Sequence, residues 1–532
     1  MLSTIFSEEI TLYHTSVFFL VFFTLCSLLR RRRAQQLANS KGLPHPPGPN
    51  PLPIVGNLFD LARGNETGIY ERLAKEYGEL VFLSALGKHV LVVNSFQAAT
   101  ELFDKRSAIY SDRAQAVMSH ELMGWDFSFA HMRYGERWKK HRRVFHRQFQ
   151  QAIAPAYWSI QRREAHALLR RLLHSPENLD YHLRHNAAAV IMSVTYGITI
   201  AFTGDHYIRL AEKALEGMAA AARPGAFLVD FVPFLKHIPD WVPGTSFKRK
   251  AQEWRAAVTG MKDAPFATVV NDMKDGKATP SFVCNLLNEL DVKEGVDDDI
   301  ETIKNCAGLT YAAGAESTVS TLASFILAIV LYPEVQAKAQ DELDRVVGRD
   351  RLPDFSDRPS LPYISAIIKE VLRWNPVAPL GFPHMSTQGD ELNGYFIPAG
   401  TIVIGHSRAI LNDPIVFPEP RRFNPDRFMS EQDKCPNSNR HLSPTDPLSA
   451  SFGYGRRFCP GRYVGEAQVW ISVACILSSF NIGPALDEMG LPIEVTPGFT
   501  TGMICHPLPF RFSMKPRGES AKVLIQQTEF NS

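Results

Sequence analysis

The stretch Phe452-Gly-Tyr-Gly-Arg-Arg-Phe-Cys-Pro-Gly461 constrains this chain more than any other, because glycines, arginines and one cysteine stand in it at fixed spacing. A helical pattern begins directly after it, at Arg462. The positive end of a helix dipole and nearby guanidinium groups both favour an ionised cysteine sulfur. Gly455 and Gly461 lack a Cβ, so the backbone can take positive φ and approach a flat ligand closely. The sequence therefore predicts a loop that presents the Cys459 thiolate.

The spacing F-x-x-G-x-R-x-C-x-G in this stretch resembles the haem-binding loop of the cytochrome P450 superfamily. In that family the cysteine thiolate is the axial ligand of the haem iron. The resemblance implies that Cys459 binds the iron of haem b (iron protoporphyrin IX). It also implies a cytochrome P450 fold, a single haem-thiolate domain that is mainly α-helical with small β-sheets. A buried structural cysteine in a glycine-rich turn is the alternative interpretation.

The composition is compatible with this interpretation and reduces the number of possible binding partners. The chain has 532 residues, of which 45% are hydrophobic, which indicates a large folded core. The formal net charge is only +2, so we expect no nucleic-acid partner. The seven cysteines are scattered without a C-x-x-C pair, which indicates neither a disulfide framework nor a zinc site.

The N-terminal region predicts a membrane anchor. Residues 10–29 carry no Asp, Glu, Lys or Arg, and as a helix they would span about 30 Å, the thickness of a bilayer core. Arg30 to Arg33 follow the span, so the positive-inside rule places residues 1–9 in the lumen and the rest of the chain in the cytosol. A cleaved signal peptide is the weaker alternative, because the charge lies on the wrong flank.

The next segment predicts a connector between this anchor and a folded domain. Residues 43–53 contain six prolines, which favour a stiff polyproline conformation. We therefore expect a basic and proline-rich connector over residues 30–53, a catalytic domain over 54–515 and a polar C-terminal tail over 516–532. A proline-rich ligand for another domain is the alternative interpretation of the connector.

Periodicity predicts a mainly α-helical domain with a separate β region. Leu80–Leu86 and His89–Asn94 predict a β-hairpin, and Tyr395–Ile397 with Thr401–Ile404 predict a second. Helical periods cover residues 135–172, 183–200, 208–222, 250–274, 298–331, 334–347, 361–374 and 462–479.

A second motif, made of one acid and two arginines, supports the resemblance independently of the cysteine loop. Glu370 and Arg373 stand at i and i+3 of an expected helix and can form an ion pair. Alone this is a weak indication, since most such pairs are solvated. In the cytochrome P450 family an E-x-x-R pair and a later arginine, matched here by Arg427, form a buried triad. The resemblance gives all three residues a structural role.

The stretch Ala312-Ala-Gly-Ala-Glu-Ser-Thr318 lies within an expected long helix and places small residues before an acid and two hydroxyls. An acid beside an alcohol can deliver protons to a buried site. Tight packing against another helix is the alternative interpretation of the small residues. The stretch resembles the family's oxygen-activation motif, which implies catalytic roles for Glu316, Ser317 and Thr318. Ser317 stands where the family usually has threonine. Serine keeps the hydroxyl but lacks the methyl that restricts its rotamers, so the resemblance implies catalysis with less tight coupling of electron flow to product.

Several donors match family positions that hold the haem carboxylates. Trp138 and Arg142 share one helix face at i and i+4 and can offer an indole N–H and a guanidinium. A buried haem needs its two carboxylates neutralised, so convergent donors are expected. The matching residues are Arg113, Trp138, Arg142, His384 and Arg457.

The other side of the helix that carries Trp138 is basic. Lys139, Lys140, Arg143 and Arg147 lie there, where family members dock a flavoprotein reductase. A solvated charged face is the ordinary alternative. By the same resemblance, the substrate contacts are the mostly apolar segments 123–129, 310–313, 377–380 and 499–503.

Together these features predict a cytochrome P450 monooxygenase. The stretches Tyr110-Ser-Asp-Arg, Tyr134-Gly-Glu-Arg-Trp and Gly394-Tyr-Phe-Ile-Pro resemble the fungal microsomal group similar to O-methylsterigmatocystin oxidoreductases. The resemblance implies oxidation of a hydrophobic organic substrate with O2 and electrons from NADPH-cytochrome P450 reductase, in secondary metabolism or xenobiotic oxidation. It further implies a single-pass protein of the endoplasmic reticulum membrane with a cytosolic catalytic domain. Two alternatives stay open, namely a P450-fold isomerase or dehydratase that needs no reductase and a non-catalytic haem-binding protein.

Overall fold

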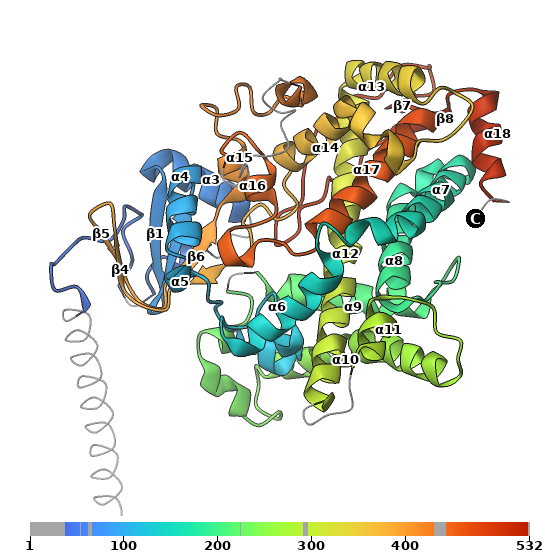
Figure 1. Cartoon of the computed structure of the whole chain (residues 1–532). Coiled ribbons are helices and arrows are strands. Elements are labelled where there is room, and N and C mark those ends of the chain that lie inside the picture. The colour runs from blue at the N-terminus through green and yellow to red at the C-terminus, as the bar shows by residue number, and fades with distance from the viewer. Residues whose placement is uncertain are drawn as a thin grey trace, which may run out of the picture.

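A computed structural model of the chain describes residues 38–53, 55–61, 66–223, 225–290, 296–429 and 443–529. Helices make up most of this structure, and the larger sheet lies to one side with α3 and α4 (Figure 1). The C-terminal end lies on the opposite side, beside α18 (Figure 1). The expected mainly α-helical fold with small sheets is confirmed. The expected membrane span, residues 10–29, lies outside the described residues.

The helices differ widely in length. The longer ones are α3 (Glu66–Tyr77), α6 (Glu136–Phe149), α7 (Trp158–His174), α8 (Leu179–Tyr196), α9 (His206–Ala221), α10 (Ser246–Lys274), α12 (Val296–Leu331), α13 (Pro333–Val346), α14 (Pro362–Trp374), α17 (Arg462–Ser479) and α18 (Glu519–Gln527). The shorter ones are α2 (Leu58–Leu61), α4 (Phe96–Ala99), α5 (Ser107–Tyr110), α11 (Phe282–Asn288), α15 (Ser407–Leu411) and α16 (Leu448–Ser451).

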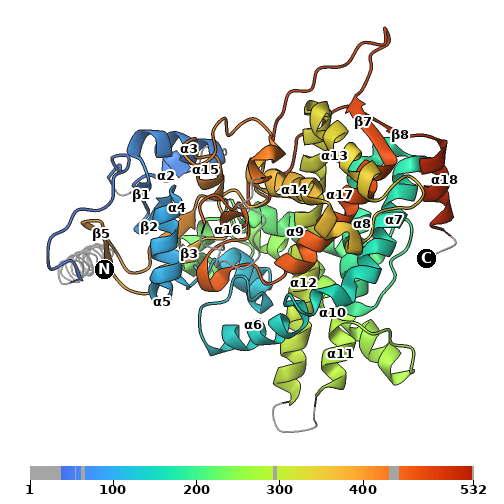
Figure 2. The same ribbon diagram turned by 45° about the horizontal axis from the view of Figure 1, so that its top comes forward.

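Helix α12 is the centre of the molecule. It packs against α6, α8, α10, α14 and α17, and Figures 1 and 2 both show it crossing beside α17. Among the described residues it alone is long and apolar enough to cross a membrane, but most of its apolar stretch is buried inside the protein. Helix α12 is therefore a core helix, and it carries the acid and hydroxyls singled out in the sequence.

The larger sheet has the strand order β1-β2-β6-β3. Strands β1 (Leu80–Ala85) and β2 (Lys88–Val93) form the first expected hairpin, with Leu80 opposite Val93. Strand β6 (Ile402–Gly405) pairs with β2 in parallel, and β3 (His384–Met385) pairs with β6 antiparallel. Strands β7 (Phe480–Pro484) and β8 (Phe512–Pro516) make a separate pair. The sheet thus connects residues 80–93 to the segment 384–405.

The prediction that Tyr395–Ile397 and Thr401–Ile404 form a hairpin is wrong. Strand β5 (Tyr395–Ile397) pairs with β4 (Asp390–Leu392) and not with β6. The turn between β4 and β5 is Asn393-Gly394, with φ of 51° and 80°. Two consecutive residues with positive φ suit the tight hairpin turns that Asn-Gly favours. Asn393-Gly394 is a stronger turn signal than Pro398-Ala-Gly400, so β5 pairs with β4. Strand β6 pairs instead with β2 and β3 in the larger sheet.

Most of the expected helices form with ends shifted by up to four residues, and two segments differ more. The expected helix over 135–172 is interrupted between α6 and α7, where Gln150 takes an extended conformation and Pro155 lies in a short 3-10 turn. Proline lacks the N–H that would continue the helix. In the expected polar tail, residues 519–527 form α18, which packs against α7 and α17 and buries Ala521 and Ile525. Helix α17 has the bounds that periodicity predicted.

The ion pair between Glu370 and Arg373 lies in the core. Arg373 Nε is 2.7 Å from Glu370 Oε2, and both side chains are fully buried. Arg427 Nε lies 3.4 Å from the same carboxylate, which also accepts the amide N–H of Asn424 at 2.8 Å. Arg373 also donates to the carbonyl of Leu411 at 3.1 Å. The expected triad forms, and it ties α14 to the segment that precedes the cysteine loop.

Candidate active site

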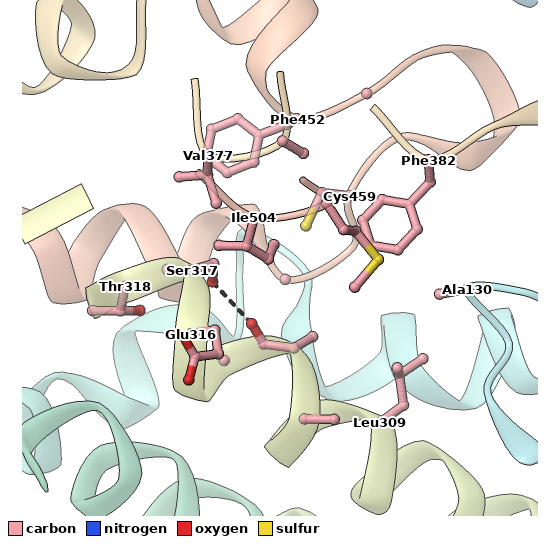
Figure 3. A pocket seen from close by; sticks show the side chains of 18 of the residues that line it. Ala130, Leu309, Glu316, Ser317, Thr318, Val377, Phe382, Phe452, Cys459 and Ile504 are labelled. Carbon is pink, nitrogen blue, oxygen red and sulfur yellow. Dashed lines mark hydrogen bonds between the residues drawn. The ribbon is translucent and has the colours of Figure 1, made fainter. Parts of the chain in front are cut away.

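One cavity of about 1060 Å³ lies between α12 and the cysteine loop. Figure 3 shows Cys459 and Phe452 on the loop side, Ser317 and Glu316 on α12, and Ile504 between them. The nine residues expected to bind the cofactor or act in catalysis all line this cavity: Arg113, Trp138, Arg142, Glu316, Ser317, Thr318, His384, Arg457 and Cys459. The structure therefore brings together residues that lie far apart in the sequence.

The cysteine loop owes its shape to backbone contacts. The amide N–H of Cys459 donates to the carbonyl of Phe452 at 2.8 Å, which closes the loop. Gly455 has a φ of 51°, and a Cβ there would overlap the carbonyl oxygen of Phe103. Gly461 has a φ of −89°, so the expected positive φ at that position is wrong. The close approach in the loop is therefore made by Gly455.

Burial changes the expected ionisation of Cys459. It raises the pKa of the thiol above its ordinary value, although the amides of Gly461 and Arg462 and the charges of Arg142 and Arg462 act in the opposite direction. The dipole and guanidinium effects expected from the sequence are present, but desolvation outweighs them. A thiol that coordinates a metal ion is deprotonated outright. The loop is thus suited to a thiolate that forms when a metal binds.

Two buried arginines, Arg113 and Arg457, line the cavity near enough for their charges to interact. Burial and the charge of Arg457 hold the pKa of Arg113 well below its usual range. Burial likewise lowers the pKa of Arg457 to about 10, with Asp112 opposing and Arg142 adding to the shift. Arg457 donates to the carbonyl of Ser111 at 2.7 Å and Arg113 to that of Ala130 at 3.0 Å. Buried cations that repel each other create a site for carboxylates, so these residues fit the haem propionates.

The other expected haem contacts lie beside this pair. The indole of Trp138 packs under Arg457, with 4.5 Å between the guanidinium carbon and the ring centre. His384 Nδ1 donates to the carbonyl of Tyr110 at 2.6 Å, and burial holds its pKa well below the usual range, so the ring is neutral. Arg142 donates to the carbonyl of Phe458 at 2.8 Å. Arg142 therefore contacts the cysteine loop itself, a role the sequence did not indicate.

On helix α12, Glu316 and Ser317 have different hydrogen-bond partners. Ser317 Oγ donates to the carbonyl of Ala313 at 2.9 Å, as the dashed line in Figure 3 shows. Glu316 forms an ion pair with Arg184 of α8 and lies 3.1 Å from His506 Nε2. Partial burial opposes ionisation, but the hydrogen bond from His506 and the charge of Arg184 outweigh it and lower the pKa of Glu316. The carboxylate is thus held ionised by residues from two other segments.

Thr318 and Gly314 occupy other sides of the same helix. The Thr318 side chain is buried, whereas that of Ser317 is half-buried. A Cβ on Gly314 would lie 2.9 Å from Cδ1 of Ile191, so this glycine allows α12 to approach α8 closely. The packing interpretation of the small residues therefore applies to Gly314, although it also lines the cavity.

The rest of the lining includes residues that the sequence did not indicate. The expected substrate segments contribute Trp125, Phe129, Thr310, Val377 and Met503. Helices α8 and α9 and the residues just after α9 add a charged set that sequence reasoning missed: Arg184, Arg209, Glu212, Lys213, Glu216 and Arg223. His506 and Arg462 were also missed. No local pattern marks these residues, because only the tertiary fold brings α8, α9 and the C-terminal loop to the cavity.

The basic side of α6 is largely paired within the chain. Lys139 lies 2.7 Å from Glu136, and Lys140 lies 2.7 Å from Asp299. Arg147 pairs with a carboxylate just after α11, at Glu289. The pairs of Lys139 and Arg147 are exposed, and exposed ion pairs are weak, so a partner can compete for these two cations.

Comparison with known proteins agrees with the geometry of the cavity. Residues 46–514 match the family model "Cytochrome P450". The chain is 42% identical to cytochrome P450 monooxygenase 98 of Postia placenta over 92% of this chain and 93% of that protein. It is 41% identical to cytochrome P450 monooxygenase ple1 of Rhodocybe pseudopiperita, over 90% and 91% of the two chains. It is 37% identical to tryptamine 4-monooxygenase of Psilocybe cyanescens, over 94% and 97%. The chain belongs to the cytochrome P450 family and is a haem-thiolate monooxygenase that binds haem b.

Proposed function

We propose that this monooxygenase oxidises a hydrophobic organic molecule in fungal secondary metabolism or xenobiotic oxidation. The observation that carries the proposal is the cavity that has Cys459 on one wall and Ser317 on the other. Aromatic and aliphatic side chains, among them Trp125, Phe129 and Ile504, line the space between them. A lining of this kind binds apolar ligands and fixes them with a few polar groups.

We assign Cys459 as the ligand of the haem iron. Arg113, Trp138, Arg142, His384 and Arg457 hold the haem and its two carboxylates. When bound, the haem supplies dioxygen activation with two electrons from a redox partner and two protons, so that one oxygen atom enters the substrate and the other leaves as water. The residues of this chain orient the cofactor, exclude water and neutralise its carboxylates. Support for these roles comes from Arg113 and Arg457, which are both buried and line the cavity.

Glu316 and Ser317 are proposed to manage proton delivery, with Thr318 in a lesser role. The Glu316 carboxylate is about 20% exposed, so it can exchange protons with solvent. Ser317 is the next residue and lines the cavity. A proton taken up at the Glu316 carboxylate can pass to the Ser317 hydroxyl directly or through one water. Thr318 contributes less, because its side chain is buried on another face of α12.

We further propose that the chain is attached to the endoplasmic reticulum membrane and receives electrons from NADPH-cytochrome P450 reductase through the basic side of α6. Apart from residues 10–29, support for attachment comes from the segment between α9 and α10. Phe234 and Trp241 there are 71% and 82% exposed. Lys236 and Lys248 lie near them in sequence and pair with carboxylates of this chain. Exposed aromatic residues beside cations are typical of membrane interfaces.

Co-expression with a reductase, followed by mass spectrometry of the metabolites, tests the proposed function. The substrate panel holds a sesquiterpene, an aromatic polyketide and, because one relative is a tryptamine 4-monooxygenase, tryptamine. We expect NADPH-dependent products heavier by one oxygen atom from at least one apolar substrate, and none from Cys459→Ala. Turnover of only small polar molecules would contradict the proposed substrate class. Product formation without NADPH would contradict the reductase.

A further inference from the structure

Arg462 is a second guanidinium held against the cysteine loop. Its Nη1 donates to the carbonyl of Cys459 at 3.1 Å, and its Nη2 donates to the hydroxyl of Tyr463 at 2.6 Å. The guanidinium carbon lies 4.1 Å from the ring centre of Tyr463 and 4.9 Å from that of Phe458. Two hydrogen bonds and two aromatic faces therefore fix this positive charge in one position.

The charge of Arg462 is not neutralised within the described part of the chain. No ion pair joins Arg462 to a carboxylate there, and its Nε is buried without a hydrogen-bond partner. The side chain as a whole is half-buried and lines the cavity that contains Cys459. A charge in such a place is screened less by water and salt than a charge on the surface.

Arg142 and Arg462 together form a positive clamp on the cysteine loop. Arg142 donates to the carbonyl of Phe458 and Arg462 to the carbonyl of Cys459, which are consecutive carbonyl groups. Both positive charges favour the ionised sulfur. A positive charge near the iron ligand also favours the state of the centre that carries one more electron, because that state is more negative by one unit.

We propose that Arg462 sets the reduction potential of the haem by stabilising the ferrous, thiolate-bound centre electrostatically. This inference rests on ligation of the iron by Cys459, as proposed above. One electron from the redox partner converts ferric to ferrous haem, and no bond to Arg462 forms or breaks. Arg462 is thus a positioning residue whose fixed charge makes that first electron transfer more favourable.

Spectroelectrochemical titration of the substrate-free holoprotein tests this role. The neutral variants Arg462→Gln and Arg462→Met should make the ferric-to-ferrous equilibrium constant about tenfold less favourable, which is a shift of about −59 mV for one electron. Arg462→Lys keeps the charge and should retain most of the potential. The matched control is Arg456→Gln, which removes an exposed guanidinium whose hydrogen bond goes to Tyr134 at 2.8 Å. That variant should leave the potential unchanged, and the shift in the neutral variants should persist at high salt.

The outcomes separate this inference from the proposed function. The ferrous CO complex is recorded first for each variant, so that thiolate ligation is known before the potential is interpreted. If the wild type shows thiolate ligation but neither neutral variant shifts the potential, Arg462 does not tune the haem and the proposed function stands. An equal shift in Arg456→Gln would also overturn the inference, because it would make the effect one of net charge. Slower reduction by the reductase at an unchanged potential would assign Arg462 to partner docking instead.

Discussion

The two walls of the cavity are held by different kinds of interaction. The cysteine wall, residues 452–462, packs against the carbonyl of Phe103 at Gly455 and is hydrogen-bonded to the carbonyl of Ser111 through the Arg457 side chain. Helix α14, which carries the buried Glu370 ion pair, accepts a hydrogen bond from the residue just before this wall, Ser451. The helical wall, residues 309–318 of α12, keeps its acid in place through partly exposed partners on α8 and in the C-terminal loop. Buried contacts resist solvent and salt, whereas exposed ion pairs respond to both.

The difference has a functional meaning. The iron ligand must stay in one position, and its wall is held by contacts that are shielded from solvent. The acid on the helical wall must exchange protons with solvent, and its contacts are of a kind that can open and close. Substitutions at four positions test this difference between the cysteine wall and the helical wall. The first is at the fully buried ion pair of Glu370.

Removing the charge of Glu370 should have the largest effect on stability. Glu370→Gln leaves the fully buried Arg373 without its carboxylate, which costs about 3–5 kcal/mol of unfolding free energy. The measurement is chemical denaturation of the haem-saturated protein. The control is Asp426→Asn, which breaks an ion pair with Lys338 in which both side chains are 52% exposed and should cost less than about 1 kcal/mol. Equal losses in the two variants would mean that the cysteine wall does not depend on buried support.

Gly455→Ala should have the second largest effect. The added Cβ would overlap the carbonyl oxygen of Phe103 and would also place alanine at a φ of 51°, so we expect a loss of about 2 kcal/mol or more together with reduced haem content. The matched control is Gly276→Ala, where φ is 68° but no atom lies within 4 Å of the added Cβ. That variant should lose about 1 kcal/mol and keep its haem. Similar haem content in both variants would show that the close contact with Phe103 is not needed.

The cysteine wall could be predicted from the sequence to a much greater extent than the helical wall. Glycine, arginine and cysteine at fixed spacing identify a local backbone shape, so Gly455, Arg457 and Cys459 are recognisable from the sequence alone. The partners of Glu316 lie 132 and 190 positions away in the chain, and no spacing rule connects such distant segments. The wrong prediction of the second hairpin has a different cause, because here the sequence does contain the needed signal. Asn393-Gly394 is a clear turn dipeptide, and it determines that β5 pairs with β4.

Two hydroxyl variants on the helical wall test the proposed proton relay. Ser317→Ala should raise the hydrogen peroxide released per NADPH consumed and lower product on the order of tenfold, since the hydroxyl that passes the proton is lost. Ser317→Thr should preserve coupling, because the added methyl restricts the rotamers of the same hydroxyl. Thr318→Ala is the matched control, with a buried side chain on another helix face. Uncoupling in Thr318→Ala alone would move the relay to Thr318.

The smallest effect should come from the Glu316 cluster, and it should depend on pH. The pKa of Glu316 is lowered in the folded protein, so its contribution is fully present above its ordinary pKa of 4.5 and is lost as the pH falls through the lowered folded value. Glu316→Gln should therefore cost about 1–2 kcal/mol at pH 7, and the difference from the wild type should shrink below pH 4.5. Denaturation across this pH range measures it.

Glu519→Gln provides the control for that titration, because Glu519 is 78% exposed and its nearest cation, Lys522, lies 3.5 Å away. Its difference from the wild type should stay near zero at every pH. His506→Gln keeps a hydrogen-bond donor for Glu316 and should retain more of the stability at pH 7 than His506→Ala does. A pH-independent loss in Glu316→Gln would mean that the carboxylate acts through packing and not through its charge. The helical wall would then be as rigid as the cysteine wall, and proton exchange at Glu316 would need another route to solvent.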